Sequence, residues 1–259
     1  MTAAAPAGRR HDALVPRVTG FITVVAALLL IEGLIRAGML NRFIVPPPSE
    51  IIGSFYRLFA SEHVIRRFLL TAGECLAAGI LLTVFGVAGG VLMQRYKLWQ
   101  QACETWVAAL ASAPLVLMYP LFMVLFGRNA WSVIIMGFIS GLPPVILKTI
   151  EGVAATRKVL VNVGRSFRLS PAQQFRKIMF PAALPTIFVG IRLGLVFALI
   201  NVVGTEFLIN FGGLGQLIAD LAERYDLAGT YAAICLVIAV SILFFVVLEK
   251  VERWLRPAD

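Results

Sequence analysis

Six long apolar blocks constrain this chain more than any other feature of its sequence. Each is close to the roughly 20 residues that cross a bilayer as an α-helix. Only 14% of the residues are charged and 59% are apolar, whereas a water-soluble domain of this length needs more polar surface. We therefore predict an all-α fold, a polytopic bundle of six transmembrane helices. The predicted spans are 19–37, 66–93, 103–126, 131–150, 183–207 and 229–249.

The first block follows three arginines, Arg9, Arg10 and Arg17, as the core of a signal peptide would. However, it exceeds the roughly 7–15 residues of such a core, and no small-x-small cleavage site follows it. We expect a retained helix after an N-terminal tail at 1–18. This helix and the external segment after it together cover 19–65.

The distribution of positive charge predicts the orientation of the chain. With the N-terminus in the cytoplasm, 15 of the 23 Lys and Arg residues lie on cytoplasmic segments and 7 on external ones, and all five lysines lie inside. Cytoplasmic loops of membrane proteins carry this excess. We expect both termini in the cytoplasm, and the net charge of +9 then needs no nucleic-acid partner.

Residues for catalysis or metal binding are not grouped in this sequence. Cys75, Cys103 and Cys235 lie in or beside apolar blocks without CxxC spacing, and the two histidines, His11 and His63, are far apart. The phosphate-binding pattern Gly-x4-Gly-Lys-Ser/Thr does not occur. We expect no catalytic residue, no metal site and no cofactor bound by this chain.

Two groups of helix-breaking residues stand out. Pro46 to Pro48 precede Ser49, a candidate N-cap for an amphipathic helix on the outer face. Its apolar positions are Ile51, Ile52, Phe55, Leu58 and Phe59. Further breakers lie within the third and fourth spans, either as kinks or as backbone that lines a polar pathway. They are Pro114, Pro120, Gly141, Pro143 and Pro144.

The longest cytoplasmic segment, at about 151–182, is helical in character but too polar to span a membrane. Ser170 is a predicted N-cap, with Pro171 at the first helical position. Gln173 lies three residues after the cap and completes a capping box. A sharply bounded helix is therefore expected to start at Ser170.

This helix carries apolar residues at helical spacing, and Pro181 is expected to end it. The apolar positions are Phe175, Ile178 and Met179. A preceding helix is expected at about 152–167. The residues alone favour equally a partner docked on this face and a helix lying on the membrane surface.

The segment resembles the EAA loop of type I ABC importer permeases. That loop has Glu-Ala-Ala, three residues, Gly, nine residues and Ile-x-Leu-Pro, and the corresponding positions here are 162–164, Arg168 and 178–181. The resemblance covers about 20–256 and is strongest to permeases for taurine, alkanesulfonates, nitrate and thiamine precursors. Other familial segments are 45–50, 113–127, 182–192, 203–207 and 212–218.

The resemblance implies a type I ABC importer (MetI-like) permease fold in the bacterial cytoplasmic (inner) membrane. Its core would cover 66–256, with five transmembrane helices and a coupling loop at 151–181. A homodimer, or a pair with a related permease, would form a pathway through membrane lipid. The solute would be a small organic anion, such as a sulfonate, taurine or a nitrate-like compound, or a vitamin precursor.

The resemblance also implies partners. Two cytoplasmic ATP-binding subunits would hold ATP and Mg and dock on the coupling loop, so this chain would not itself be an enzyme. An external solute-binding protein, periplasmic or lipid-anchored, would deliver the solute. The implied coupling residues are Arg165, Phe167, Leu169, Ser170, Gln173, Phe175 and Ile178.

Two departures from the family pattern affect the loop. Asn162 replaces the family's glutamate, and Arg168 replaces its glycine. Because glycine adopts positive φ without steric cost, Arg168 must either accept that strain or form a different turn.

Charged residues inside the spans are costly and face a bundle interior, a cavity or a partner. We expect Glu32 to pair with Arg36, Glu74 to be structural and Arg192 to snorkel toward the inner face. Glu206 is interpreted as a pathway or gate residue, with a hydrogen bond that locks two helices as the alternative. The pathway or gate candidates are Glu206, Asn201, Met118, Pro120, Gly212 and Gly213.

Two other classes of protein fit the sequence less well. An ion-coupled secondary transporter needs no partner and has more spans, arranged as repeats, and no repeat is evident here. A membrane-embedded enzyme needs a constellation of reactive side chains that the sequence does not provide.

Overall fold

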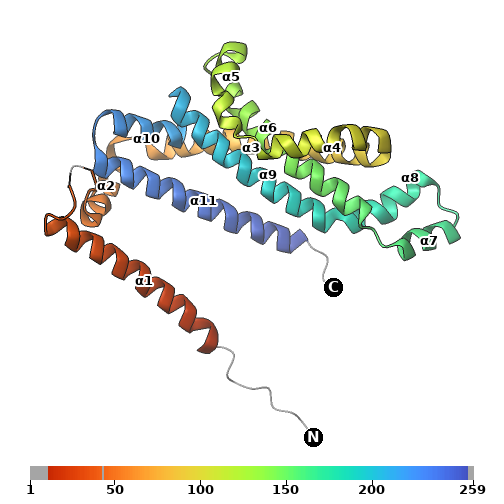
Figure 1. Cartoon of the computed structure of the whole chain (residues 1–259), viewed down its shortest axis with the longest axis horizontal. Helices are drawn as coiled ribbons and strands as arrows, with labels where there is room; N and C mark the ends of the chain where they lie inside the picture. The colour runs from red at the N-terminus through yellow and green to blue at the C-terminus, as the bar shows by residue number, and fades with distance from the viewer. Residues whose placement is uncertain (1–10, 43, 256–259) are drawn as a thin grey trace, which may run out of the picture.

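The computed structural model describes residues 11–42 and 44–255, and every regular element in these ranges is a helix (Figure 1). The long helices are α1 (His11–Arg36), α3 (Val64–Arg95), α6 (Ala130–Ala154), α9 (Phe180–Ile209) and α11 (Leu227–Leu255). Shorter elements connect them: α2 (Pro48–Ser61), α4 (Lys97–Ser112), η2 (Leu115–Met118), α5 (Tyr119–Phe126), α7 (Lys158–Ser166), α8 (Pro171–Gln174), η3 (Phe175–Met179) and α10 (Gly213–Glu223). Of the predicted tail at 1–18, residues 1–10, with Arg9 and Arg10, lie outside the described residues, and α1 already begins at His11.

Five of the described helices are long and apolar enough to cross a membrane, which confirms five of the six predicted spans. The third, 103–126, is not a straight helix, because α4 and the η2–α5 segment meet at an angle of 89°. Pro114 causes the break. It disfavours helical backbone at the residue before it, and Ala113 is extended at φ −74° and ψ 135°.

The centre of the molecule is formed by α3, α6 and α9, which pack closely along their lengths (Figure 1). Small residues permit this approach, as is usual between membrane helices. A Cβ atom at Gly141 of α6 would lie 2.4 Å from the carbonyl oxygen of Gly194 on α9. The three helices therefore form the rigid part of the bundle, with a buried cluster that includes Ala78, Val145 and Ala198.

The helix expected to end at Pro181 instead continues into α9, so that prediction is wrong. The apolar stretch runs without a sharp break from Pro171 to Ile209. The five residues of η3 form a π-helical turn directly before Phe180 and Pro181. A proline inside a helix clashes with the carbonyl four residues earlier, and the wider π turn is a common way to absorb such a defect.

Ser49 does not cap α2, which corrects a second prediction. Helix α2 begins at Pro48, where a missing N–H costs nothing, and Pro47 takes the cap position. The Ser49 hydroxyl instead donates to Glu32 Oε1 at 2.8 Å. The predicted pair is present as well, with Arg36 Nη2 2.7 Å from Glu32 Oε1. Glu32 therefore ties the end of α1 to the start of α2.

One end of the bundle is assembled from α2, α10 and α11 around a buried apolar cluster that includes Leu58, Leu217 and Ala232. Ion pairs link the polar side chains around this cluster. Arg67 of α3 lies 2.7 Å from Asp220 of α10. The apolar cluster holds the amphipathic helix α2 against α10 and α11, and this ion pair joins α3 to α10.

Arg192 pairs with a carboxylate near the C-terminal end of α11. Its Nη1 atom lies 2.8 Å from Glu252 Oε2 on α11, and Glu252 is buried. The Arg192 guanidinium also lies 5.7 Å from the centre of the Phe245 ring. The ion pair joins α9 to α11, and the expectation that Arg192 snorkels toward the inner face stays a prediction.

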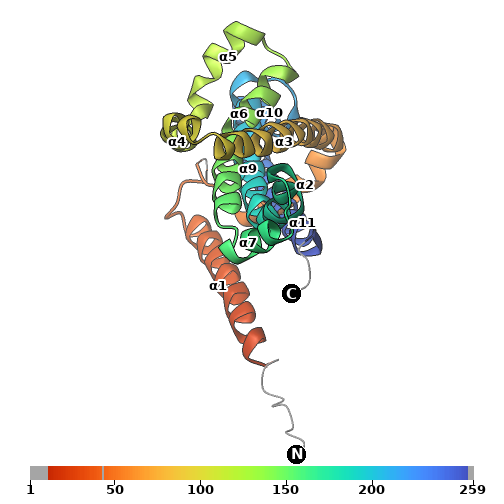
Figure 2. The same cartoon turned by 90° about the vertical axis from the view of Figure 1, so that its right-hand side faces the viewer.

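Helix α1 stands apart from the other long helices (Figure 2). Of the residues in the most apolar 18-residue stretch of α1, only 6% are buried within this chain, against 44% for the corresponding stretch of α6. The packing of α1 within the chain is mainly with α2. Its apolar surface is therefore available to lipid or to another chain.

Candidate functional site

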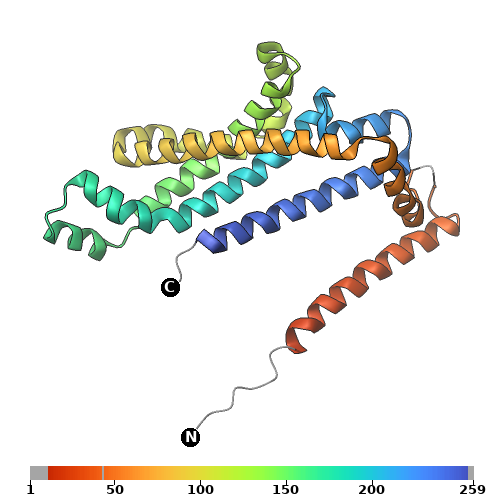
Figure 3. The same cartoon turned by 180° about the vertical axis from the view of Figure 1, so that it is seen from behind.

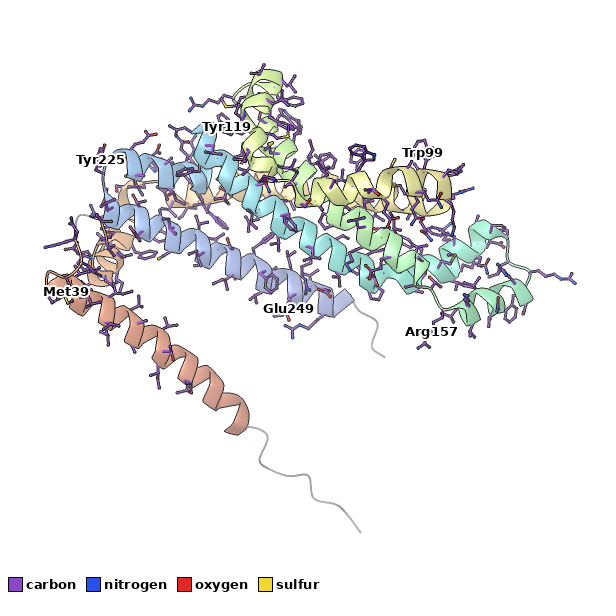
Figure 4. All side chains as sticks on the ribbon, in the orientation of Figure 1. Met39, Trp99, Tyr119, Arg157, Tyr225 and Glu249 are labelled. Carbon is purple, nitrogen blue, oxygen red and sulfur yellow. The ribbon has the colours of Figure 1, made fainter. Side chains whose placement is uncertain are left out.

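A helical hairpin, α7 with α8 and η3, projects from the end of the bundle opposite α2 and α10 (Figures 1 and 3). It reaches beyond the ends of α4 and α11 in both views. Figure 4 shows Arg157 at this end and Tyr225 at the other. The hairpin joins α6 to α9, so it is mounted on two helices of the rigid centre.

The turn between α7 and α8 is a Schellman motif with Arg168 in the left-handed position. Arg168 has φ +55°. The N–H of Leu169 donates to the Gly164 carbonyl at 3.1 Å, and the N–H of Arg168 donates to the Arg165 carbonyl at 2.8 Å. This pair of bonds closes a helix that normally ends in glycine. Arg168 therefore keeps the turn expected of glycine and accepts the strain of a side chain there.

The predicted capping box at Ser170 is confirmed. The Gln173 N–H donates to Ser170 Oγ at 3.3 Å, and the Ser170 N–H donates to Gln173 Oε1 at 2.9 Å. The Gln174 side chain donates to the Val161 carbonyl on α7. These bonds stabilise the start of α8 and hold the two arms of the hairpin together.

The apolar face predicted for docking is directed mostly toward the protein interior. Phe175 and Met179 pack against the buried cluster of Val153, Ala183 and Ile187. A Cβ atom at Gly164 would lie 2.6 Å from Ile178 Cδ1, so Ile178 packs against α7. Because η3 runs directly into α9, its apolar stripe continues the stripe with which α9 packs on α6.

The exposed apolar residues of the hairpin lie on α7 instead. Val159 and Phe167 are 70% and 76% exposed, and Val163 is exposed as well. They recur every four residues and so share one face of the helix. Of these three residues, sequence reasoning named only Phe167 as a site residue. The i, i+4, i+8 spacing would have predicted the rest of the face.

The other implied coupling residues lie around this face. Arg165, Ser170 and Gln173 are exposed, and Leu169 is partly buried at the turn. Arg165, Phe167 and Ser170 are therefore all exposed on the hairpin. The structure does not bring Phe175 and Ile178 to the exposed surface.

Glu206, at the opposite end, is fully buried and joins three helices. Its Oε1 accepts a hydrogen bond from Thr71 Oγ1 of α3 at 2.7 Å, and its Oε2 accepts one from the Gly215 N–H of α10 at 2.8 Å. Thr71 Oγ1 accepts from the Leu214 N–H at 2.9 Å. A carboxylate is stabilised at a helix N-terminus. The geometry therefore favours the helix-locking interpretation of Glu206.

The residues beside Glu206 form one compact joint. A Cβ atom at Gly213, where φ is +76°, would lie 2.0 Å from Glu206 Oε1, so only glycine fits there. Gly212 is the cap residue of α10 and also has positive φ. Glu74 of α3 is buried next to Glu206. The expectation of a structural role for Glu74 stays a prediction.

The remaining pathway candidates are not gathered at one place. Asn201 is buried on α9, where its amide donates to the Phe197 carbonyl of the same helix at 3.0 Å. Met118 and Pro120 are exposed at the junction of η2 and α5, the limb on which Figure 4 labels Tyr119. Within one copy of the chain, the candidates therefore divide between a buried joint and an exposed limb.

Known proteins with similar sequences cover nearly the whole chain. A formylaminopyrimidine transport permease protein, ThiX, of Halalkalibacterium halodurans is 24% identical over 96% of this chain and 97% of its own length. A nitrate import permease protein, NrtB, of Synechocystis is 25% identical over 94% and 91%. A putative aliphatic sulfonates transport permease protein, SsuC, of Bacillus subtilis is 26% identical over 90% and 81%.

Solved structures support the fold. An inward-facing structure of the MetNI methionine ABC transporter contains a chain that matches with a TM-score of 0.64 at 18% identity. The match covers 75% of this chain and 96% of that one. The alignment confirms the MetI-like permease fold expected from the sequence.

The family model that describes the binding-protein-dependent transport system inner membrane component matches residues 78–257, more than half of the chain. This range contains the hairpin, the α6–α9 pair and Glu206 with its α10 partners. The chain therefore belongs to the family of inner membrane components of binding-protein-dependent transport systems, the membrane subunits of ABC importers.

Proposed function

We propose that cytoplasmic ATP-binding subunits dock on the exposed face of α7 and drive solute import through a pathway formed by two copies of this chain. The observation that carries this proposal is the apolar face of Val159, Val163 and Phe167 on the α7 arm, which lies between the candidate spans Ala130–Ala154 and Pro171–Ile209. An amphipathic helix of this kind fits a groove on a partner protein. ATP and Mg belong to that partner.

The hairpin is suited to transmit movement. Its first arm follows α6, and its second arm continues through η3 into α9 without a flexible linker. The capping box and the Schellman turn fix the angle between the arms. A displacement of α7 by the ATP-binding subunits would therefore move α9 relative to its neighbours.

The proposed orientation places the hairpin and both termini in the cytoplasm. The hairpin and the α3–α4 turn, near the labelled Trp99, lie at the same end of the bundle (Figure 4). Both carry the lysines and arginines expected of cytoplasmic loops. The α2–α10 end would then face the external solute-binding protein.

The solute is proposed to be a small organic anion or a vitamin precursor. The names of the similar permeases support this range, since they refer to formylaminopyrimidine, nitrate and aliphatic sulfonates. Uptake of labelled solutes by reconstituted vesicles tests it. Uptake should stop on ATP depletion and survive collapse of ion gradients. The opposite result would identify an ion-coupled secondary transporter.

Docking is tested by replacing Val163 and Phe167 with Asp. The ATP-binding subunits should then fail to co-purify. Uptake should fall about tenfold or more, because each 1.4 kcal/mol of lost docking energy weakens affinity tenfold. A matched control, Val163→Ile with Phe167→Leu, keeps the apolar face and should behave as the parent chain.

A second control separates docking from folding. Phe175→Asp places a charge in the interior of the hairpin, so it should lower the thermal stability of the permease, whereas the two exposed Asp substitutions should not. Co-purification of the ATP-binding subunits with the Val163 and Phe167 Asp variant, with uptake intact, would contradict the docking assignment.

A further inference from the structure

The hairpin is an uncompensated cluster of positive charge. Between residues 152 and 205 the sequence contains no Asp or Glu. The hairpin and its flanks carry six exposed cations: Arg157, Lys158, Arg165, Arg168, Arg176 and Lys177. Among the described residues, none of the six lies within 4.0 Å of a carboxylate, whereas the nearby Lys148 pairs with Glu151 at 2.6 Å.

Cations and apolar residues are arranged on α7 in two neighbouring stripes. Lys158 and Arg165 are seven residues apart and share one stripe with Asn162 between them. Val159 and Val163 form the adjacent stripe. The opposite side of α7, at Gly164, packs against η3. The exposed surface therefore has an apolar strip bordered by positive charge.

The position of the hairpin distinguishes a protein partner from the bilayer. It extends past the ends of α4 and α11 and does not fold back over them (Figures 1 and 3). Phe167 is 76% exposed and directly precedes Arg168, the turn residue. The most exposed apolar side chain of the hairpin thus lies near its tip, where a protein in the cytoplasm can reach it.

We propose that the cleft on the ATP-binding subunit that receives α7 is rimmed by carboxylates, which pair with Lys158 and Arg165 around an apolar floor. This inference rests on the proposed docking function and adds the charge of the partner's surface. Complementary charge mainly increases the rate of association and excludes wrong partners. Because Asn162 stands where the family pattern has glutamate, the α7 surface contains no negative charge that such a cleft would repel.

Salt and charge reversal together test the proposal. The dissociation constant of the ATP-binding subunits is measured for the permease in nanodiscs of neutral phosphatidylcholine, at NaCl concentrations from about 50 to 500 mM. At the highest concentration the screening length falls below about 5 Å. For the parent chain, binding should weaken roughly tenfold over this range. Lys158→Glu with Arg165→Glu should weaken binding roughly tenfold or more at low salt and remove most of the salt dependence.

Matched variants isolate the charge of α7. Lys97→Glu reverses an exposed cation at the start of α4, at the same end of the bundle but outside the hairpin, and should leave binding unchanged. Lys158→Gln with Arg165→Gln removes charge without adding repulsion and should give an intermediate loss. An unchanged thermal stability shows that the variants are folded.

Each outcome has a separate meaning. Tight binding that depends on neither salt nor the two reversals overturns the acidic cleft and leaves docking intact. No binding by the parent chain at any salt concentration overturns the proposed function itself. An effect of the reversals that appears only in nanodiscs containing anionic phosphatidylglycerol assigns the cations to lipid headgroups and also overturns the proposal.

Discussion

Arg168 holds a left-handed backbone position that glycine would occupy at no steric cost. Replacing it with Gly should strengthen the turn by roughly 0.5–1 kcal/mol, because the relief of about 1–2 kcal/mol of strain exceeds the entropy that glycine adds to the unfolded chain. Hydrogen exchange of the α7 amides measures this as slower local opening.

The control is Arg168→Ala, which removes the charge and keeps the Cβ atom. It should leave exchange nearly unchanged. Equal protection in the Gly and Ala variants would show that charge, and not backbone strain, governs the turn.

Sequence reasoning at the scale of residues succeeded where the determinants are local. Ser170 and Gln173 form the predicted box because both partners lie within four positions. It failed for Ser49, whose partner is Glu32, because tertiary packing brings that carboxylate close.

Glu206 of α9 is hydrogen-bonded to α3 and α10, so its role concerns how whole helices are held together. Glu206→Gln keeps the shape but puts an amide N–H₂ where one carboxyl oxygen accepts a bond from α3 or α10, so that two donors face each other. It should destabilise the permease by roughly 1–3 kcal/mol, the cost of a buried polar group left unsatisfied. Thermal unfolding in detergent measures the loss.

A double-mutant cycle with Thr71→Val tests whether the joint acts as a unit. Thr71 bridges Glu206 and Leu214, so the two losses should be non-additive. A Glu206→Gln variant with parental stability but impaired uptake would instead support the gate interpretation.

The elements themselves were predictable to different degrees. Five spans followed from apolar length alone. The course of the third span and the continuation through Pro181 did not, because a proline can either break a helix, as at Pro114, or be absorbed by a π turn, as at η3. Which of these occurs depends on packing that a single sequence does not specify.

At the scale of the whole molecule, the chain combines a rigid centre with limbs that have little packing of their own. The centre depends on close approach at Gly141 and Gly194, whereas only 6% of the residues in the most apolar stretch of α1 are buried. Replacing residues 19–31 with an unrelated apolar sequence, with Glu32 and Arg36 kept, should therefore change the thermal stability of the protomer by less than about 1 kcal/mol.

The matched replacement exchanges a similar length of α9, residues 187–199, for the same unrelated sequence. With Arg192 kept, it preserves the hydropathy and the ion pair to Glu252 but removes Gly190 and Gly194, at each of which a Cβ atom would lie within 2.6 Å of another residue. This variant should lose its cooperative unfolding transition. If both replacements destabilise the monomeric protomer equally, α1 contributes packing within the chain that its exposure in this structure does not reveal.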